Sequence, residues 1–252
     1  MNTHTNEDIK YELSLIFPVH NEGNIVEDVI HTLFKTIHRR FEIIAVYDKE
    51  EDITIPVLQK LQSQYPALHS VQNKEGCGVL GAFRTGLDEA KSPVVGIWCA
   101  YHTDPQGSLN MMMDLMDEGY DLVSGNRYAY KMQRTRGPRM KFFLSITGNF
   151  IFSKLLNIPL FDMSTSIKLF RTSVLKSIKI ETPPKGGWAF VFELVVKIAI
   201  NKLRMGEIKL DPSSLQFAGV TNFKIQRYLP YYLYWTWYGF CHLRCFKSIF
   251  KQ

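Results

Sequence analysis

Short apolar runs that alternate with amphipathic stretches constrain the fold of this chain more than any other feature. Leu13–Val19, Phe41–Asp48 and Val94–Ala100 are apolar runs of strand length, and a shorter strand is expected at 69–73. The stretches between them place apolar residues at helical spacing. Parallel strands that are buried on both faces have this composition and are joined by helical crossovers. The pattern therefore predicts an α/β fold with a doubly wound, mostly parallel sheet flanked by helices.

The composition fits one main domain with a C-terminal addition. The 252 residues are 46% hydrophobic and 21% charged, a balance typical of a globular protein. We expect a flexible, polar lead-in over 1–12 instead of a signal peptide, a main domain over 13–224 and a basic, aromatic helical appendage over 225–252. The four cysteines form no CxxC pair, which favours reduced thiols and a cytoplasmic location.

The ends of the predicted strands locate the site. Ligands of a doubly wound sheet bind beyond the carboxyl ends of its strands, and the loops there carry function more often than the strands do. These ends read PVHNEG, VYDKEED and WCAYHTDP, and each contains polar or charged side chains. The sequence therefore predicts a polar ligand site where these three loops meet.

Eight segments resemble, in the same order, the motifs of one enzyme family. They are FPVHNEGNI, VYDKEEDITIPVL, GVLGAFRTGLDEAK, GYDLVSGNRY, DMSTSIKLFR, GWAFVFEL, GVTNFK and the aromatic RYLPYYLYW. FPVHNEGNI resembles the PxYNExxNI opening of family 2 glycosyltransferases with the GT-A fold, in the branch that includes dolichol-phosphate-mannose synthase and bacterial polyprenyl-phosphate enzymes. The resemblance runs from about Leu13 to about Trp237.

The resemblance implies an inverting glycosyltransferase that moves a sugar from a nucleotide-sugar to a polyprenyl phosphate or a glycan. A phosphate acceptor is already a nucleophile, whereas a hydroxyl acceptor needs a carboxylate base. The alternative is a GT-A-like protein without activity that binds a nucleotide or a partner glycosyltransferase. A homo-oligomer is left open in both interpretations.

The resemblance assigns the nucleoside to the loops after the first two strands. Asp48 is the candidate for hydrogen bonds to the base, and Glu22 for the ribose or the base edge. Glu22 could instead complement the dipole of the following helix, and Glu50 and Glu51 are interpreted as a solvated turn. The predicted nucleotide-binding residues are Pro18, Asn21, Glu22, Tyr47, Asp48, Gly78, Ala100 and Tyr101.

The metal-binding DxD motif of the family lacks its carboxylates in this chain. Alignment on the family's proline puts Trp98 and Ala100 at the acidic positions, and a shift by one residue puts Cys99 and Tyr101 there. Mg²⁺ and Mn²⁺ require hard oxygen ligands, which none of these side chains offers in acidic form.

Two neighbouring residues remain as metal candidates. They are Asp104 and His102, although Asp104 could equally cap the helix that follows. The use of Mg²⁺ or Mn²⁺ is therefore left open, and fixed basic residues could do the same work at a leaving diphosphate.

Three residues are the predicted catalytic residues. Arg127 in GNRY corresponds to a phosphate ligand of the family, and Lys168 replaces an arginine while keeping its charge. Asp162 could position the acceptor or act as the base, or it could form an Asx turn. The predicted phosphate and acceptor ligands are Arg136, Arg139, Ser166, Arg171, Glu193, Asn222 and Lys224. For two of these regions an alternative stays open, a solubilising loop over 134–141 and an ion pair for Glu193.

The C-terminal segment is aromatic and basic. Tyr228–Leu243 carries no charge but is too short and too aromatic for a confident membrane span. After Asp211 the chain has no acidic residue. Tyrosine, tryptophan and flanking cations favour the membrane–water interface, so we expect peripheral contact with the cytoplasmic face of a membrane through 225–252. Packing of this helix on the main domain is the alternative. No nucleic-acid partner is expected, because no RNA-binding motif accompanies the basic residues.

Overall fold

A single mixed sheet forms the centre of the described part of the chain. The computed structural model describes residues 11–104, 106–129, 139–210 and 225–245. The sheet has seven strands there, in the order β3-β2-β1-β4-β6-β5-β7. The strands are β1 (Leu13–Val19), β2 (Phe41–Tyr47), β3 (Leu68–Gln72), β4 (Val94–Ile97), β5 (Leu122–Asn126), β6 (Lys168–Arg171) and β7 (Met205–Lys209). The helices are α1 (Ile25–Thr36), α2 (Ile55–Gln62), α3 (Val79–Glu89), α4 (Ser108–Asp117), α5 (Arg139–Leu156), α6 (Thr172–Ser177), α7 (Ala189–Ile200) and α8 (Ile225–Phe240), with a short 3-10 turn, η1 (Pro184–Gly186).

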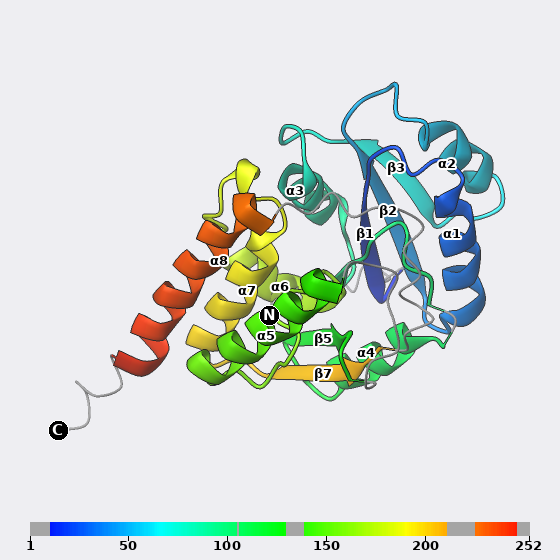
Figure 1. Ribbon diagram of the computed structural model, residues 1–252. Coiled ribbons are helices and arrows are strands. Elements are labelled where there is room, and N and C mark those ends of the chain that lie inside the picture. Colours follow the sequence, from blue (N-terminus) through cyan, green and yellow to red (C-terminus); the bar gives the residue numbers. More distant parts are fainter. Residues whose placement is uncertain (1–10, 105, 130–138, 211–224, 246–252) are drawn as a thin grey trace, which may run out of the picture.

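Helices cover both faces of the sheet (Figure 1). α1, α2 and α4 pack on one face, against Leu15, Phe17 and other side chains of the same parity. α3, α5, α7 and α8 contribute to the core on the other face, which includes Ile16 and Ile44. Successive side chains of a strand point to opposite faces, so β1 is buried on both sides. This double burial is the reason that its sequence is a continuous apolar run.

The mostly parallel sheet predicted from the sequence is confirmed. β1 pairs in parallel with β2 and β4, β2 with β3, and β5 with β7. β6 is antiparallel to both β4 and β5. The carboxyl ends of β1, β2, β4 and β5 therefore lie at the same edge of the sheet as the amino end of β6. β7 is absent from the predicted strands, because its residues are mostly half-exposed and include Glu207, so no apolar run marks it.

The C-terminal helix α8 packs against α7 and belongs to the second core. Trp235 is only 1% exposed, and its indole nitrogen donates to the Thr182 hydroxyl at 2.8 Å. The outer side of α8 and the neighbouring α5 expose large apolar side chains. They are Phe143, Leu144, Phe150, Ile151 and Leu155 on α5 and Leu229, Leu233, Tyr234 and Trp237 on α8. Within the described ranges, no helix is long and apolar enough to cross a membrane.

Candidate functional site

A cavity of about 230 Å³ lies where the loops after β1 and β2 meet, as the strand ends predict. Two predicted nucleotide-binding residues, Asn21 and Asp48, line it. The other lining residues are His20, Lys49, Glu51, Asp52 and Cys77, which the sequence analysis did not assign to the nucleotide. The nucleoside position stays a prediction, and Cys77 was missed because the segment after the third strand, NKEGCG, was not counted among the strand ends that form the site.

Asp52 holds the loop that carries Asn21. Its side chain is buried, Oδ2 accepts a hydrogen bond from the Asn21 amide at 3.0 Å, and Oδ1 accepts one from the Thr54 amide at 2.8 Å. Asn21 has φ of 60°, a left-handed conformation that asparagine tolerates better than most residues. The buried carboxylate therefore fixes the turn between β1 and α1, while Glu50 and Glu51 are exposed, as predicted for a solvated turn.

Asp48 connects the end of β2 to the start of α3. Its Oδ1 accepts from the Asn73 side-chain amide at 2.8 Å, and its Oδ2 accepts from the Gly78 amide at 2.8 Å. Gly78 has φ of 104°, which favours glycine at this position. A carboxylate has about four acceptor sites, so these two bonds leave capacity for a ligand. That Asp48 accepts hydrogen bonds from a nucleotide base stays a prediction. Tyr47, also among the predicted nucleotide-binding residues, packs its side chain against the core.

Glu22 lies beside the turn that replaces the metal loop. Burial raises the pKa of Glu22, although the carboxylate also accepts a hydrogen bond from the His20 amide. The charge of Glu22 adds a small upward effect to the pKa of Cys99 and of Tyr101. Pro18, at the end of β1, pairs in register with Val46 and shapes the backbone there.

The turn after β4 is built from side chains that carry no charge. Trp98 is 1% exposed and points into the core, where its indole nitrogen donates to the His102 carbonyl at 2.6 Å. Ala100 is buried on the same side. The Cys99 Sγ lies 3.0 Å from the Ser166 hydroxyl. Which of the two pairs stands at the acidic positions of the DxD motif stays open, and neither pair supplies a carboxylate.

Cys99 and Tyr101 are neutral at physiological pH. Burial raises the pKa of the Cys99 thiol, and the neighbouring thiol together with burial raises the pKa of Tyr101 well above its usual value. Neither group is therefore a hard anionic ligand for Mg²⁺ or Mn²⁺.

The two metal candidates do not fit a metal site. Both oxygens of Asp104 accept hydrogen bonds at the start of α4: Oδ1 from the amide and hydroxyl of Ser108, and Oδ2 from the Leu109 amide at 2.9 Å. Asp104 is fully buried and satisfies the first two amides of α4 from outside the helix, whereas the N-cap position itself is taken by Gly107. Burial and the nearby Arg127 lower the pKa of His102 to about 3. In the ranges that the structure covers, no three histidine, cysteine or acidic side chains gather as a metal site.

An ion pair marks the other half of the site, at the end of β5. Arg127 donates to Asp162 through Nε at 2.7 Å and through a terminal nitrogen at 2.9 Å, and to the Ser164 hydroxyl at 3.1 Å. Asp162 is completely buried, whereas Arg127 keeps 24% of its side chain exposed. Burial opposes the charge of Asp162, but Arg127 outweighs it and lowers the pKa of the carboxyl. Asp162 therefore stays ionised and directs Arg127.

This geometry assigns Asp162 to positioning, one of the alternatives that the sequence left open. Its Oδ1 also accepts from the Thr165 amide at 3.2 Å, as in the predicted Asx turn. A carboxylate with a lowered pKa and no exposed atom is poorly suited to take a proton from an acceptor.

Lys168 lies below the ion pair and is buried. Its Nζ donates to the Ser124 hydroxyl at 2.6 Å and to the Asp162 carbonyl at 3.2 Å. Burial lowers the pKa of Lys168 to about 7, against the charges of Asp162 and Glu207. Glu207 accepts from the Asp162 amide at 2.9 Å, so it supports the same loop from β7. Lys168 thus supports the backbone of Asp162. Its predicted contact with a substrate stays a prediction.

Two predicted ligands lie elsewhere. In β6, Lys168 pairs with Ile97 and Arg171 with Val94, so Arg171 stands at the opposite edge of the sheet and donates to the Met116 carbonyl at 2.6 Å. Glu193 is fully buried and accepts from the amides of Glu181 and Thr182 at 2.6 and 2.8 Å. Lys197 completes an ion pair with it at 2.8 Å, which is the alternative left open for Glu193. Neither residue fits the predicted role of an acceptor or phosphate ligand.

The remaining predicted ligands are placed only in part. Ser166 lies beside Cys99, as described above. Arg139 is the first residue of α5. Arg136, Asn222 and Lys224 lie outside the described residues, as does the rest of the GVTNFK segment.

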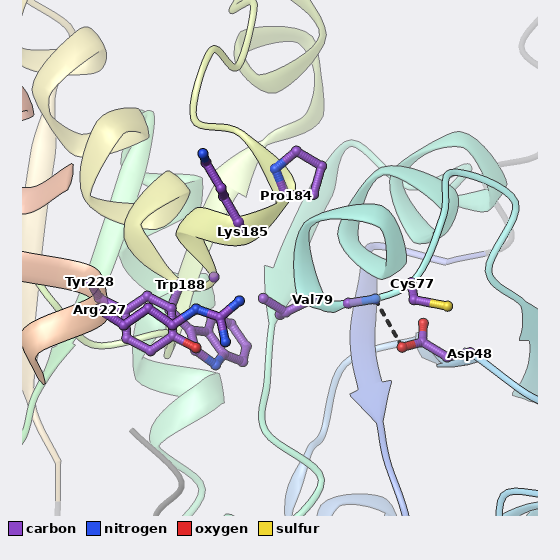
Figure 2. A pocket seen from close by; sticks show the side chains of 10 residues that line it. Asp48, Cys77, Val79, Pro184, Lys185, Trp188, Arg227 and Tyr228 are labelled. Atoms are coloured by element: carbon purple, nitrogen blue, oxygen red, sulfur yellow. Dashed lines mark hydrogen bonds between the residues drawn. The ribbon is translucent and has the colours of Figure 1, made fainter. Parts of the chain in front are cut away.

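A larger cavity, of about 420 Å³, adjoins the nucleoside cavity (Figure 2). Asp48 and Cys77 line both cavities. The other residues that line the larger one come from the start of α3, from η1 and the start of α7, and from the start of α8. They are Gly78, Val79, Pro184, Lys185, Gly187, Trp188, Arg227 and Tyr228.

The doubly wound sheet, with its ligand loops at the carboxyl edge and its antiparallel β6, defines the GT-A class of fold. Residues 14–179 match the model of the family described as glycosyl transferase family 2, and the chain belongs to that family. A solved structure of Mycobacterium tuberculosis glucosyl-3-phosphoglycerate synthase, in complex with Mn²⁺, UDP and glucosyl-3-phosphoglycerate, has a TM-score of 0.64 and 14% identity, over 90% of this chain and 80% of that one. S. aureus TarS has a TM-score of 0.60 and 19% identity, over 78% and 58%. These likenesses confirm the GT-A fold.

Curated relatives carry names that refer to lipid phosphates. Dodecaprenyl-phosphate galacturonate synthase of Rhizobium johnstonii is 27% identical over 70% of this chain, which spans 53% of that protein's length. Dolichyl-phosphate hexose transferase of Haloferax volcanii is 26% identical over 82% of this chain and 89% of its own length. Polyprenol monophosphomannose synthase of Mycolicibacterium smegmatis is 23% identical over 78% and 75%.

Proposed function

We propose that this protein is an inverting glycosyltransferase that moves a sugar from a nucleotide-sugar to a polyprenyl phosphate. Membership of glycosyl transferase family 2 and the names of the curated relatives support the class of reaction. The observation that carries the proposal within this chain is Arg127, a cation held at the carboxyl edge of the sheet by the buried Asp162. A binding-only GT-A-like protein is not favoured, because a decayed site has no need to retain this buried ion pair.

Arg127 is suited to the charge that develops on the leaving group. In the proposed reaction an oxygen of the acceptor phosphate attacks the anomeric carbon, a new carbon–oxygen bond forms, and the bond to the nucleoside diphosphate breaks. The electron pair of the broken bond passes to the diphosphate. A fixed guanidinium donates two hydrogen bonds to a phosphate without reorganisation during the reaction. Asp162 and Ser164 hold its orientation.

The proposed acceptor makes a general base unnecessary. A phosphate oxygen is already deprotonated at neutral pH, whereas a sugar hydroxyl needs a carboxylate close by. Asp162, the predicted base, is committed to Arg127 through two hydrogen bonds and is completely buried. The site therefore favours an acceptor that arrives as an anion over a glycan.

Mg²⁺ or Mn²⁺ does not fit the turn after β4. Neither Trp98 and Ala100 nor Cys99 and Tyr101 supplies a carboxylate there, and Asp104 accepts hydrogen bonds from the first amides of α4. In the proposed mechanism Arg127 therefore carries the charge compensation that a divalent cation supplies elsewhere.

The exposed apolar side chains of α5 and α8 support a peripheral membrane contact. Trp237 is 67% exposed, and Leu233 is exposed one turn earlier on the same helix. Lys154 is exposed at the end of α5, and Arg244, which donates to the Lys154 carbonyl at 3.2 Å, is exposed beyond α8. An apolar face with cations at its border suits the interface of an anionic membrane, where a polyprenyl phosphate resides.

The test is transfer of labelled sugar to a polyprenyl phosphate. The protein is incubated with UDP- and GDP-sugars, and the lipid product is extracted and identified by mass. Arg127→Gln is expected to lower the rate about 10²–10³-fold, as removal of one donor to a developing anion does in other enzymes. Arg40→Gln is the matched control, because Arg40 is an exposed arginine whose partner is Glu12. A variant Arg127→Gln with an unchanged rate contradicts the proposed role, and absence of product with every donor overturns the proposed function.

A further inference from the structure

Glu207 on β7 connects the two segments that carry Arg127 and Asp162. β7 lies beside β5 at one end of the sheet, and Glu207 is in register with Ser124 (Figure 1). Its Oε1 accepts a hydrogen bond from the Asp162 amide at 2.9 Å, and its Oε2 accepts one from the Asn126 side-chain amide at 2.8 Å. Asn126 is the last residue of β5 and directly precedes Arg127. One carboxylate therefore joins the exit of β5 to the loop that holds Asp162.

The backbone of Asp162 is held from two sides. Its amide donates to Glu207, and its carbonyl accepts from the Lys168 amine at 3.2 Å and from the Ser124 hydroxyl at 3.3 Å. The Asp162 side chain is thereby left to accept both hydrogen bonds from the Arg127 guanidinium. A charged group keeps a precise place only when the residues around it are themselves held by further contacts. Glu207 supplies such a contact on both sides of the ion pair.

The carboxylate of Glu207 is matched to the two groups that it contacts. The Oδ1 atom of Asn126 accepts from the Tyr128 amide at 2.8 Å, so the Asn126 NH₂ group faces Glu207. Both groups in front of Glu207 are therefore donors, and an ionised carboxylate accepts through both oxygens. Burial raises the pKa of Glu207, and the two hydrogen bonds act against this rise because they favour the ionised form.

Glutamine at position 207 cannot make the same two contacts. Its side chain has one oxygen, so its NH₂ group meets either the Asp162 amide or the Asn126 NH₂ group, and both are donors. Asn126 cannot turn its own oxygen toward position 207 without losing the contact with the Tyr128 amide. The substitution of one oxygen by nitrogen therefore breaks one of the two contacts while it keeps the size of the side chain.

We infer that Glu207 is a positioning residue for the transfer reaction, which fixes the place of the Arg127 guanidinium through Asn126 and Asp162. The inference rests on the proposed function for the role of Arg127. A fixed donor stabilises a developing charge only from the correct place, and a displacement of about 1 Å can lower a rate about 10²-fold. Since that charge develops in the transition state, the loss of Glu207 is expected to lower kcat and to leave KM for the donor unchanged.

The experiment exchanges donor and acceptor between positions 126 and 207. Glu207→Gln places two NH₂ groups against each other, and Asn126→Asp places two carboxylates against each other. In the double variant the new glutamine donates to the new aspartate, while the contacts with the amides of Asp162 and Tyr128 are kept. Each single substitution is expected to lower kcat about tenfold, the effect of one hydrogen bond to a charged group. The double variant should return to within about threefold of the unchanged protein.

The control is Glu89→Gln, because Glu89 pairs with Lys74 at the surface at 2.6 Å. This substitution should leave kcat and KM unchanged. Far-ultraviolet circular dichroism of each variant checks that its fold is intact.

A spectroscopic readout follows the position of Arg127 without any transfer reaction. The Arg127 Nε–H group donates to Asp162 at 2.7 Å, and its nitrogen–proton resonance is identified by its absence in Arg127→Gln. We expect this resonance to shift, and its proton to exchange faster with water, in Glu207→Gln and in Asn126→Asp. It should return toward its original position in the double variant. A role of Glu207 in stability alone would leave the resonance of the folded protein where it is.

The possible results separate the inference from the proposed function. An Arg127 resonance that is the same in all variants overturns the inference, as does an unchanged kcat in Glu207→Gln. A double variant that is no better than Glu207→Gln also overturns it, because the exchange of donor and acceptor then restores nothing. If the unchanged protein transfers no sugar but the Arg127 resonance depends on Glu207 as expected, the proposed function fails while the positioning of Arg127 by Glu207 stands.

Discussion

The two halves of the candidate site use charged residues in different ways. On the β1–β4 side, Asp48 and Asp52 hold loops in place, and the turn that should carry acidic metal ligands has the neutral Cys99 and Tyr101. On the β5–β7 side, Arg127 and Asp162 form a buried, bidentate ion pair supported by further polar groups. The site therefore keeps a fixed charge although the acidic metal motif is lost. That charge is the Arg127 guanidinium at the end of β5, and the turn after β4 has none in its place.

Asp162→Asn tests the charged half and has the largest expected effect. Removal of one partner from a buried ion pair leaves the other charge without compensation, and costs about 3–5 kcal/mol of unfolding free energy. We expect a loss of this size in urea unfolding, together with a fall in transfer rate like that of Arg127→Gln. Asp114→Asn is the control, because Asp114 pairs with Arg39 at the surface and should cost at most about 1 kcal/mol. Equal effects of the two substitutions contradict the account.

Much of the fold could be predicted from the sequence, and the reason is double burial. β1 and β2 contact cores on both faces, so their apolar runs were recognisable, whereas the half-exposed β7 gave no such signal. The resemblance to a family supplied the order of the motifs and directed attention to Arg127.

The partners of the site residues could not be predicted in the same way. That Arg171 stands at the far edge depends on the direction of β6, which a single short strand does not reveal. Glu207 came from the strand that was missed, and Arg227 was counted with a basic tail, although it lines a cavity with α3. These contacts join segments far apart in the chain, and local patterns carry no information about them.

Restoring carboxylates to the neutral half tests whether side chains at these positions decide metal binding. In the double variant Cys99→Asp and Tyr101→Asp, we expect Mn²⁺ to bind and to raise the free energy of unfolding. At a Mn²⁺ concentration one hundred times the Kd, the gain is about 2.7 kcal/mol. Thermal unfolding with and without Mn²⁺ measures it. The unchanged protein should show no such gain, and a gain of equal size there would contradict the assignment of the turn.

The buried Lys168 predicts a dependence of stability on pH. Its pKa is lowered to about 7 in the folded protein, chiefly by burial, while an unfolded lysine keeps its proton up to about pH 10.4. Between these values the unfolded chain binds more protons, so Lys168 makes stability increase with pH, by at most about 1.4 kcal/mol per unit. The cost of burying the protonated amine is absent above about pH 10.4, grows as the pH falls, and is complete below about pH 7.

Lys168→Met isolates this contribution, because other groups also titrate in the range. Urea unfolding of the unchanged protein and the variant is compared at pH 7, 8 and 9. We expect the difference in unfolding free energy between them to change with pH, with the unchanged protein gaining relative to the variant. Parallel curves would mean that Lys168 keeps its proton in the folded state. Lys176→Met, at the surface of α6, should leave the pH dependence as it is.

The most direct test of the central claim is the transfer rate in the presence of a chelator. The account assigns charge compensation at the leaving diphosphate to Arg127, so the rate in EDTA should stay within about twofold of the rate in Mn²⁺, since Arg127 does not depend on a metal. A rate that is abolished by EDTA and restored by Mn²⁺ would contradict the account, and would show that a metal acts at this site despite the neutral Cys99 and Tyr101.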